Sequence, residues 1–277
     1  MRIALAQIDS TLGEVEANLA RIAGVVCDAE RQGADLVVFP ELAIHGYALG
    51  SIGADVAIAA GDPRLAALAS GHADVVVGFH EDGGLRTHNT AAYLAGGAVA
   101  HVQRKLCLPT YLAWEERKHA SPGQSLRAFD TRHGRAALLI CNDAWQAPLP
   151  WLAAQDGAEI LLVPANSAAG LGPPGFDPGA YWDPLLSGIA RMQQCWVVFV
   201  NRVGIEAGAC FWGGSRVVDP EGRVVAQAPR DEPALTLVDV DVPAARRHRR
   251  ALPLLAEGRL HLIEREVRRL IEQGGDA

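Results

Sequence analysis

Two spacings of apolar residues alternate along the N-terminal part of the chain. Residues 3–8 form a short, mostly apolar run typical of a strand, and a second such run covers residues 36–39. Between them, hydrophobic residues recur at the spacing of one helix face: Val15, Leu19, Ile22 and Val26. Gly33 ends this helix, and Pro40-Glu41 ends the second strand. The pattern predicts a strand–helix–strand unit with Glu41 directly behind its last strand.

The same pattern returns in the middle of the chain. Residues 135–140 form a mostly apolar run that stops at Cys141-Asn142-Asp143, and a loop then leads into a short helix ending at Gly157. The segment QGADLVVFPE at 32–41 is matched by DGAEILLVPA at 156–165. We therefore predict an α/β fold built from two pseudo-symmetric β-α-β halves, with Glu41 and Cys141 at comparable edges.

Further apolar runs predict the remaining strands: 74–80, 89–94, 98–103, 196–201, 215–219, 223–227 and 235–240. An amphipathic helix is predicted over residues 259–271, with an apolar face of Leu260, Ile263, Val267 and Leu270. Segment 167–184 contains four Gly and four Pro, together with Phe176, Tyr181 and Trp182. A loop of this length in a compact domain is either a functional rim or a mobile insertion.

Composition narrows the class of protein. The chain has 277 residues, 49% of them hydrophobic, and no polar or low-complexity run divides it, so we expect a single domain over residues 1–277. A net charge of −7 argues against a nucleic-acid partner, and the basic run at 246–250 fits a solvated or subunit-contact segment better. No segment resembles a signal peptide or a membrane span. Five cysteines without a CxxC pair favour the cytoplasm.

Lysine is rare in this chain. Of the 25 Lys and Arg residues only Lys105 and Lys118 are lysines, which leaves 23 arginines. Where the chain needs a solvated positive charge it uses arginine, so a remaining lysine is a candidate for a task that requires a compact ammonium with an adjustable pKa. This favours Lys105, and Lys118 less strongly.

Cys141 lies where a strand turns into a helix, and backbone N–H groups at such a turn point outward and can hold an oxyanion. It is either a thiol nucleophile or a buried cysteine that packs as a small apolar residue. A thiol is mostly protonated at neutral pH, so a nucleophile needs a base or a lowered pKa. Glu41 can act as that base and Lys105 can stabilise the oxyanion. Together these three residues are sufficient for acyl transfer.

Other chemistries have less support. The nine histidines show no HExxH or other metal-ligand spacing, and we expect neither a metal nor another cofactor. A Cys–His enzyme would need His80 or His133 beside Cys141, which nothing in the sequence requires. Asp143 and Trp145 either shape the pocket or serve as a helix N-cap and a core residue.

The chain resembles the nitrilase superfamily of carbon–nitrogen hydrolases from Arg2 to about Asp241. Each matching segment is weak alone, but their order and spacing together are specific. They are FPELAIHGY at 39–47, RKLCLPTY at 104–111, WEERKHASPG at 114–123, ICNDAW at 140–145, GAEILLVPANSA at 157–168, VVFVNRVG at 197–204 and FWGGSRVVDPEGRVV at 211–225.

The resemblance implies a four-layer α-β-β-α sandwich and a catalytic triad of Glu41, Lys105 and Cys141. It also implies a second glutamate, Glu116, that hydrogen-bonds Lys105 or orients the substrate. The reaction would pass through a thioester on Cys141 and release ammonia. Homodimers or larger assemblies are implied as well, with the tail at 242–277 used in subunit contacts. We expect five further residues to bind the substrate: Tyr47, Tyr111, Asn142, Trp145 and Asn166.

The sequence ranks the possible substrates. Cys-Asn-Asp-Ala-Trp is most similar to the glutaminase domains attached to NAD synthetases, but the chain has no SGGxDS-like ATP loop, which favours an amidase that acts alone. The Trp-Glu that follows the cysteine in nitrilases is missing. A small linear carboxamide is therefore our first expectation, ahead of an N-carbamoyl compound and a nitrile. Arg191 and Arg202 are candidates to bind a carboxylate, although Arg202 fits a surface ion pair better. The alternative of another class is a catalytically silent binding or scaffold subunit.

Overall fold

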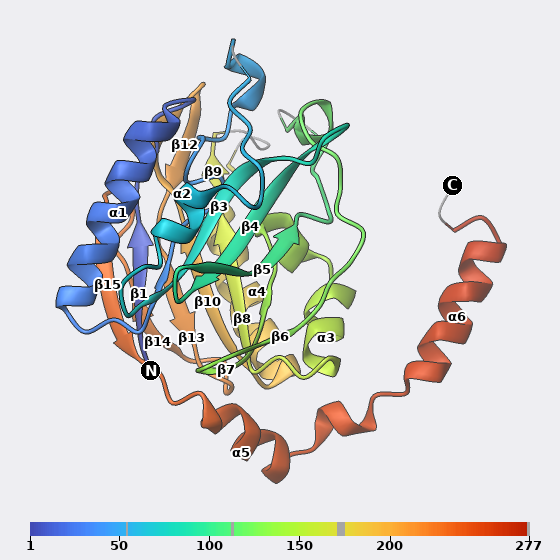
Figure 1. Ribbon diagram of the computed structural model, residues 1–277. Coiled ribbons are helices and arrows are strands. Elements are labelled where there is room, and N and C mark those ends of the chain that lie inside the picture. The colour runs from blue at the N-terminus through green and yellow to red at the C-terminus, as the bar shows by residue number, and fades with distance from the viewer. Residues whose placement is uncertain (54, 112–113, 171–174, 276–277) are drawn as a thin grey trace.

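The computed structural model describes residues 1–277 except 54, 112–113, 171–174 and 276–277. Two six-stranded sheets form its centre, with helices on the outer face of each (Figure 1). A helical arm at the C-terminus extends away from the body.

The first sheet has the strand order β15-β1-β2-β3-β4-β5. Its strands are β1 (Arg2–Gln7), β2 (Leu36–Val38), β3 (Asp74–Asp82), β4 (Thr87–Ala95), β5 (Ala98–Arg104) and β15 (Ala234–Asp239). Strands β1, β2 and β3 are parallel, whereas β4 pairs antiparallel with both β3 and β5. Strand β5 therefore runs in the direction of β2, so Glu41 and Lys105, which follow these two strands, lie at the same edge of the sheet.

The second sheet has the strand order β14-β13-β10-β8-β7-β6. Its strands are β6 (Phe129–Thr131), β7 (Gly134–Leu138), β8 (Ile160–Ala165), β10 (Trp196–Asn201), β13 (Arg216–Val218) and β14 (Val224–Gln227). The central strands β7, β8 and β10 are parallel. A small third sheet contains β9 (Ala168–Ala169), β11 (Val203–Glu206) and β12 (Ala209–Trp212).

Helices cover the two sheets from outside. They are α1 (Val15–Arg31), α2 (Pro63–Ala67), α3 (Pro148–Gln155) and α4 (Pro178–Gln193), whereas α5 (Pro243–Ala251) and α6 (Leu260–Glu272) follow in the C-terminal arm. Short 3-10 turns cover Leu49–Ser51, Glu116–Lys118, Cys141–Trp145 and Leu254–Glu257. Among the described residues, no helix combines the length and the apolar character that crossing a membrane requires.

Three apolar cores separate four layers. Helices α1 and α2 pack on one face of the first sheet, and helices α3 and α4 pack on the second sheet. The middle core joins the two sheets and contains Ile3 and Leu5 of β1 with Leu162 of β8. Because side chains alternate along a strand, Ala4 of β1 instead faces the α1 side. The predicted four-layer α-β-β-α sandwich is confirmed.

The segment at 167–184 differs from the predicted loop. Helix α4 begins at Pro178, so the second part of the segment is helical, and residues 171–174 lie outside the described residues. The Asp177 carboxylate accepts a hydrogen bond from Gly179 N and caps the helix, and Pro178 occupies a first-turn position that tolerates proline. Pro184 lies inside the helix. Because proline usually ends or kinks a helix, the sequence pattern predicted a loop here.

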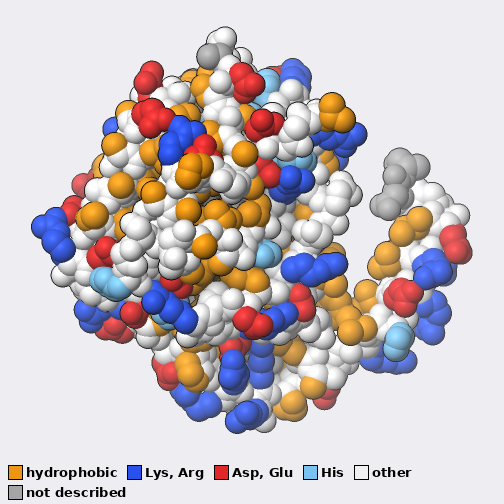
Figure 2. Space-filling model, viewed as in Figure 1, with side chains coloured by type: hydrophobic (Ala, Val, Ile, Leu, Met, Phe, Trp, Pro, Cys, Tyr) orange, Lys and Arg blue, Asp and Glu red, His pale blue; other side chains and the backbone are white. Residues whose placement is uncertain are grey.

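The C-terminal arm has an anchored part and a projecting part. Helix α5 is held to the body, where the Arg249 guanidinium donates to the backbone carbonyls of Ala158 at 2.6 Å and Gln193 at 3.0 Å. Helix α6 matches the predicted helix at 259–271 and projects from the body (Figure 1). Five of its apolar residues are 41–52% exposed: Leu260, Ile263, Val267, Leu270 and Ile271. In Figure 2 hydrophobic side chains line the side of this arm that faces the body.

Candidate active site

The ends of four strands bring the predicted catalytic residues together. Glu41 follows β2, Lys105 follows β5, Cys141 follows β7, and Asn166 follows β8. Lys105 Nζ lies 2.6 Å from Glu41 Oε1, and the Asn166 backbone N–H donates to Glu41 Oε2 at 2.8 Å. Glu41 thus joins the two sheets, because its carboxylate is bonded by residues that follow strands of both.

Lys105 lies between two carboxylates. Its ammonium donates to Glu41 at 2.6 Å and to Glu116 Oε1 at 2.7 Å, and none of its side chain is exposed. The predicted hydrogen bond between Glu116 and Lys105 is therefore present. Asn89 Nδ2 also donates to Glu41 Oε1 at 2.7 Å, and the Tyr47 hydroxyl donates to Glu116 Oε1 at 2.7 Å. All the hydrogen bonds to Glu116 are at Oε1, since Oε2 is buried without a partner among the described residues.

Burial and charge act in opposite directions on the pKa values of these groups. Burial by itself lowers the pKa of Lys105, but the carboxylates of Glu116 and Glu41 outweigh it and raise the pKa well above its ordinary value. Burial raises the pKa of Glu116, and the Lys105 ammonium opposes that rise. Lys105 therefore keeps its charge, and it supplies a fixed positive charge in a buried site.

Cys141 begins a tight turn beside this cluster. Its φ is +47°, in the left-handed region, which costs a non-glycine residue about 1–3 kcal/mol. Burial raises the pKa of the Cys141 thiol well above its ordinary value, and the Glu41 carboxylate raises it further, whereas Lys105 and the Asn166 backbone N–H lower it. The thiol is therefore protonated at neutral pH, and a nucleophilic role requires a base to remove its proton.

Asp143 connects the Cys141 turn to the segment that follows Lys105. Its Oδ1 accepts from the backbone N–H groups of Leu106 at 3.0 Å and Cys107 at 2.8 Å, and its Oδ2 accepts from Ile140 N at 3.1 Å. Burial raises the pKa of Asp143 to about 7. Asn142 adds to the connection, because its Nδ2 donates to the Cys107 carbonyl at 2.9 Å. Asp143 was predicted either to shape the pocket or to cap a helix. The structure favours capping, because the Asp143 carboxylate accepts from the backbone N–H of Ile140 directly before the Cys141 turn.

A cavity of about 380 Å³ opens above Cys141. All five residues predicted to bind substrate line it, together with Glu116: Tyr47, Tyr111, Asn142, Trp145 and Asn166. The segment at 167–184 contributes Ser167, Ala168, Phe176, Pro178, Tyr181 and Trp182 to its walls. Sequence reasoning missed Trp114, although it begins the WEER segment that was singled out for Glu116. Trp182 is 1% exposed, and its indole N–H donates to Ser167 Oγ at 2.9 Å.

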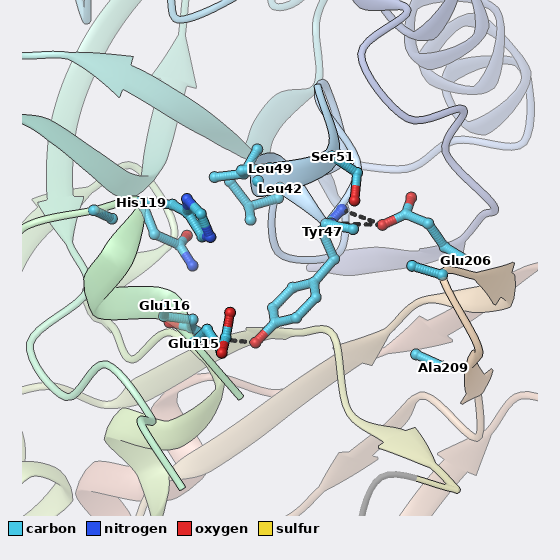
Figure 3. Close-up of a pocket in the computed structure, with 14 residues that line it drawn as sticks. Leu42, Tyr47, Leu49, Ser51, Glu115, Glu116, His119, Glu206 and Ala209 are labelled. Carbon is cyan, nitrogen blue, oxygen red and sulfur yellow. Dashed lines mark hydrogen bonds between the residues drawn. The ribbon is translucent and has the colours of Figure 1, made fainter. Parts of the chain in front are cut away.

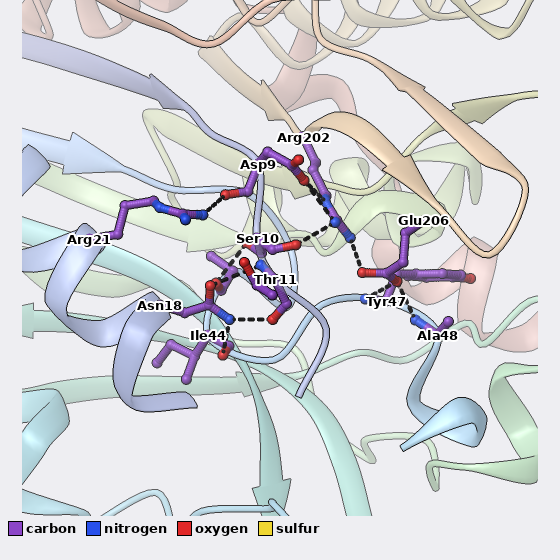
Figure 4. A network of polar contacts seen from close by, with 11 residues as sticks. Asp9, Ser10, Thr11, Asn18, Arg21, Ile44, Tyr47, Ala48, Arg202 and Glu206 are labelled. Carbon is purple, nitrogen blue, oxygen red and sulfur yellow. Dashed lines mark hydrogen bonds and ion pairs between the residues drawn. The ribbon is translucent and has the colours of Figure 1, made fainter. Parts of the chain in front are cut away.

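A buried ion-pair network holds the backbone at Tyr47 (Figure 4). The Glu206 carboxylate accepts from the N–H groups of Tyr47 at 2.8 Å and Ala48 at 2.7 Å, and it also accepts from Arg202 at 2.8 Å. Glu206 can approach the backbone this closely because residue 46 is a glycine. A Cβ on Gly46 would lie 2.7 Å from Glu206 Oε2, which is too close. The network fixes the backbone from which the Tyr47 hydroxyl reaches Glu116.

The two arginines considered for a carboxylate lie outside the cavity. Arg202 is in an ion pair, as predicted, but the pair is not on the surface: Arg202 is 2% exposed and lies 2.9 Å from Asp9. Arg202 can be buried because Glu206, the last residue of β11 in the small third sheet, supplies a second carboxylate on the buried side. Arg191 donates to the backbone carbonyl of Glu221 at 2.7 Å.

A second cavity, of about 360 Å³, adjoins the first (Figure 3). Tyr47 and Glu116 line both cavities, so their hydrogen bond forms a shared wall. In Figure 3 the Tyr47 ring extends along this wall toward Glu116, and His119 lies on the opposite side of the view from the ring. The second cavity is also lined by Glu115 and Glu206.

The two histidines considered as partners for Cys141 lie elsewhere. The His80 ring packs against His45 with ring centroids 6.0 Å apart, and His133 Nε2 lies 3.5 Å from Asp74. Neither lines the Cys141 cavity. Across the described ranges, His, Cys, Asp and Glu side chains do not gather in groups of three or more that could hold a metal ion.

The family comparison agrees with this geometry. The family model described as carbon-nitrogen hydrolase matches residues 2–250. An (R)-stereoselective amidase from Pseudomonas sp. is 32% identical over 268 residues, which cover 95% of this chain and 93% of the amidase. A glutamine-dependent NAD(+) synthetase from Xylella fastidiosa is 33% identical over 92% of this chain. The chain spans only 46% of that synthetase, so it matches about half of its length.

Solved structures share the fold. A variant of the amidase from Nesterenkonia sp. superposes with a TM-score of 0.81 and 27% identity, and the match covers 96% of each chain. That structure shows the acetamide moiety of fluoroacetamide covalently added at the active-site cysteine of the Nesterenkonia enzyme.

Proposed function

Because the chain belongs to the carbon–nitrogen hydrolase family and is an amidase-type enzyme of it, we propose that it hydrolyses a small linear carboxamide through a thioester on Cys141 and releases ammonia. The observation that carries this proposal is the buried Glu41–Lys105–Glu116 cluster beside the cavity that Cys141 lines. A catalytically silent scaffold would have no need to keep an ammonium and two carboxylates buried together, at the cost of their desolvation. The cysteine adduct of the Nesterenkonia amidase supports the same assignment.

The proposed reaction has two halves. Glu41 takes the thiol proton, and the Cys141 sulfur attacks the amide carbonyl carbon. Lys105 and the Asn142 backbone N–H stabilise the oxyanion. The carbon–nitrogen bond then breaks, and ammonia leaves with the proton that Glu41 returns. Water attacks the thioester and gives a proton to Glu41. The carbon–sulfur bond then breaks, and Glu41 returns the proton to the departing sulfur, which releases the carboxylic acid and restores the Cys141 thiol.

Glu116 has a supporting role in this proposal. Its Oε1 accepts from Lys105, and its Oε2 is free to accept a hydrogen from the substrate amide nitrogen. The Tyr47 hydroxyl fixes the carboxylate in this orientation. Positioning of this kind contributes to the rate because the reacting atoms must be held close to their attack geometry.

The test is a screen for released ammonia. Purified protein is incubated with primary amides, N-carbamoyl compounds and nitriles, and the Cys141→Ala protein provides the blank. We expect release from at least one primary amide, with none above the blank from nitriles. Turnover of nitriles without activity on any amide would overturn the proposal.

We also propose that the chain forms a dimer or larger assembly through helix α6. Its apolar stripe of Leu260, Ile263, Val267, Leu270 and Ile271 is 41–52% exposed on a helix that projects from its own body. A helix of this pattern is stable in water when the stripe is covered. A second copy of the chain is the partner that this proposal assigns to it.

A further inference from the structure

The walls of the Cys141 cavity are aromatic and carry no positive charge. None of the described residues that line it is a lysine, an arginine or a histidine. Aromatic side chains make up nearly half of the lining: Tyr47, Tyr111, Trp114, Trp145, Phe176, Tyr181 and Trp182.

The ionisable groups of the neighbouring Glu41–Lys105–Glu116 cluster do not supply a positive charge either. Glu41 and Glu116 provide two carboxyl groups to the one ammonium of Lys105. If both carboxyls are ionised the cluster carries one negative charge, and if one is protonated it is neutral. In neither state is it positive, so a carboxylate brought into this cavity would lose its water without gaining a charged partner.

Three polar atoms in the lining have no hydrogen-bond partner among the residues that the structure describes. The side-chain amide of Asn166 is 1% exposed, and neither its Nδ2 nor its Oδ1 is hydrogen-bonded within the described part of the chain. Glu116 Oε2 is the third. Buried polar groups normally have partners. This set contains two oxygens that accept and one amide nitrogen that carries two hydrogens to donate. A ligand that both donates and accepts, as a primary carboxamide does, satisfies it.

The geometry points to a charge preference in the substrate that rests on the proposed amidase function. The acyl side of the carboxamide is an apolar or aromatic group that is neutral or carries an ammonium, and a carboxylate next to the amide excludes the compound. An ammonium gains from the aromatic faces and from the Glu116 carboxylate. Trp145 and Tyr181 have ring centroids 6.3 Å apart and are 36% and 54% exposed, so they form the open rim where such a group enters.

Three amides that differ in one substituent test this preference. Phenylalaninamide, 3-phenylpropanamide and 2-benzylmalonamate share one skeleton and carry an ammonium, a hydrogen and a carboxylate beside the amide. We expect kcat/KM for the first two to agree within about tenfold, and the malonamate to be lower than both by about 100-fold. Equal or faster hydrolysis of the malonamate would overturn the inference.

Binding separates this inference from the proposed function. Calorimetric titration of the Cys141→Ala protein with the same three amides reports affinity without turnover. Tighter binding of the ammonium and neutral amides supports the inference even if the wild-type protein releases ammonia from no amide in the screen, an outcome that would refute the proposed function alone. Tightest binding of the malonamate would refute the inference whatever the wild-type protein hydrolyses.

A gain of activity provides a second test. Tyr181→Arg places a guanidinium at the rim and should raise kcat/KM for the malonamate about tenfold. Leu152→Arg is the control, since Leu152 is 44% exposed on α3 and does not line the cavity. An equal change in both variants would show that net charge, and not the cavity, selects the substrate.

Discussion

The ammonium of Lys105 and the carboxylate of Glu41 form an ion pair of 2.6 Å in which neither side chain has any exposed surface. Glu116 completes the cluster at 2.7 Å from the same ammonium. Removing one member of a buried charge cluster is costly because the remaining charges lose their partner and cannot reach water. The cluster is therefore important for folding as well as for the proposed chemistry.

Replacing each lysine in turn measures how much the buried cluster contributes to the stability of the fold. Lys105→Ala should lower the free energy of unfolding by about 3–5 kcal/mol, since it leaves two buried carboxyls together. Lys118→Ala is the matched control, because Lys118 is 65% exposed and pairs with Glu115 at the surface, and it should leave stability nearly unchanged. Urea unfolding of both variants measures the difference. Equal effects of the two substitutions would show that the buried cluster does not stabilise the fold.

Tyr47→Phe removes the hydrogen bond that fixes Glu116. We expect a stability loss of about 1 kcal/mol and a kcat lower by about tenfold with a smaller change in KM. Tyr93→Phe is the control, because the Tyr93 hydroxyl donates to Asp74 at 2.7 Å and does not line the cavity. The control should lose similar stability and keep its kcat. If kcat falls equally in both variants, Tyr47 acts only through folding.

Glu41→Gln should make Cys141 easier to ionise while it abolishes turnover. Burial is the larger cause of the raised thiol pKa, and the Glu41 carboxylate is the next. Without that charge, Lys105 faces the sulfur unopposed by Glu41, and the thiol pKa should fall. The pH dependence of Cys141 alkylation by iodoacetamide, followed by peptide mass, measures it. A thiol pKa that stays the same or rises would contradict the assigned electrostatics.

Light scattering tests the proposed assembly. The wild-type protein at micromolar concentration should exceed the 29.4 kDa mass of one chain. The double substitution Ile263→Asp with Val267→Asp should return it to that mass, since a charge on the apolar stripe opposes burial. Arg268→Asp on the polar side of α6, where Arg268 is 69% exposed, should leave the assembly intact. A monomeric wild-type protein would refute the proposal.

The sequence predicted those helices and strands whose apolar residues are also the ones buried in the fold. Helix α1 is an example, because the apolar face that includes Leu19, Ile22 and Val26 is the face that is buried. Helix α4 shows the opposite case. Asp177 and Pro178 are a recognisable helix start, but Pro184 and the glycine-rich approach suggest a loop, and only packing against the second sheet decides the matter.

The candidate site likewise contains residues that the sequence predicts and contacts that it does not. Glu41, Lys105 and Cys141 follow strands, so parallel strand order brings them to one place, and the sequence motifs indicate their chemistry. The bonding of Asp143 could not be read from the sequence, because two of its partners, Leu106 and Cys107, lie 37 and 36 residues away. The pairing of Arg202 with Asp9 could not be read from the sequence either, because Asp9 is 193 residues distant.

The most direct test of the central claim is the mass of the protein during turnover. Wild-type protein mixed with 3-phenylpropanamide and quenched in acid should carry one phenylpropanoyl group, and digestion should place that group on Cys141. The Cys141→Ala protein should carry none and should release ammonia at a rate lower by several orders of magnitude. Ammonia release at the wild-type rate from Cys141→Ala, with no acyl group on either protein, would contradict a thioester mechanism at this site.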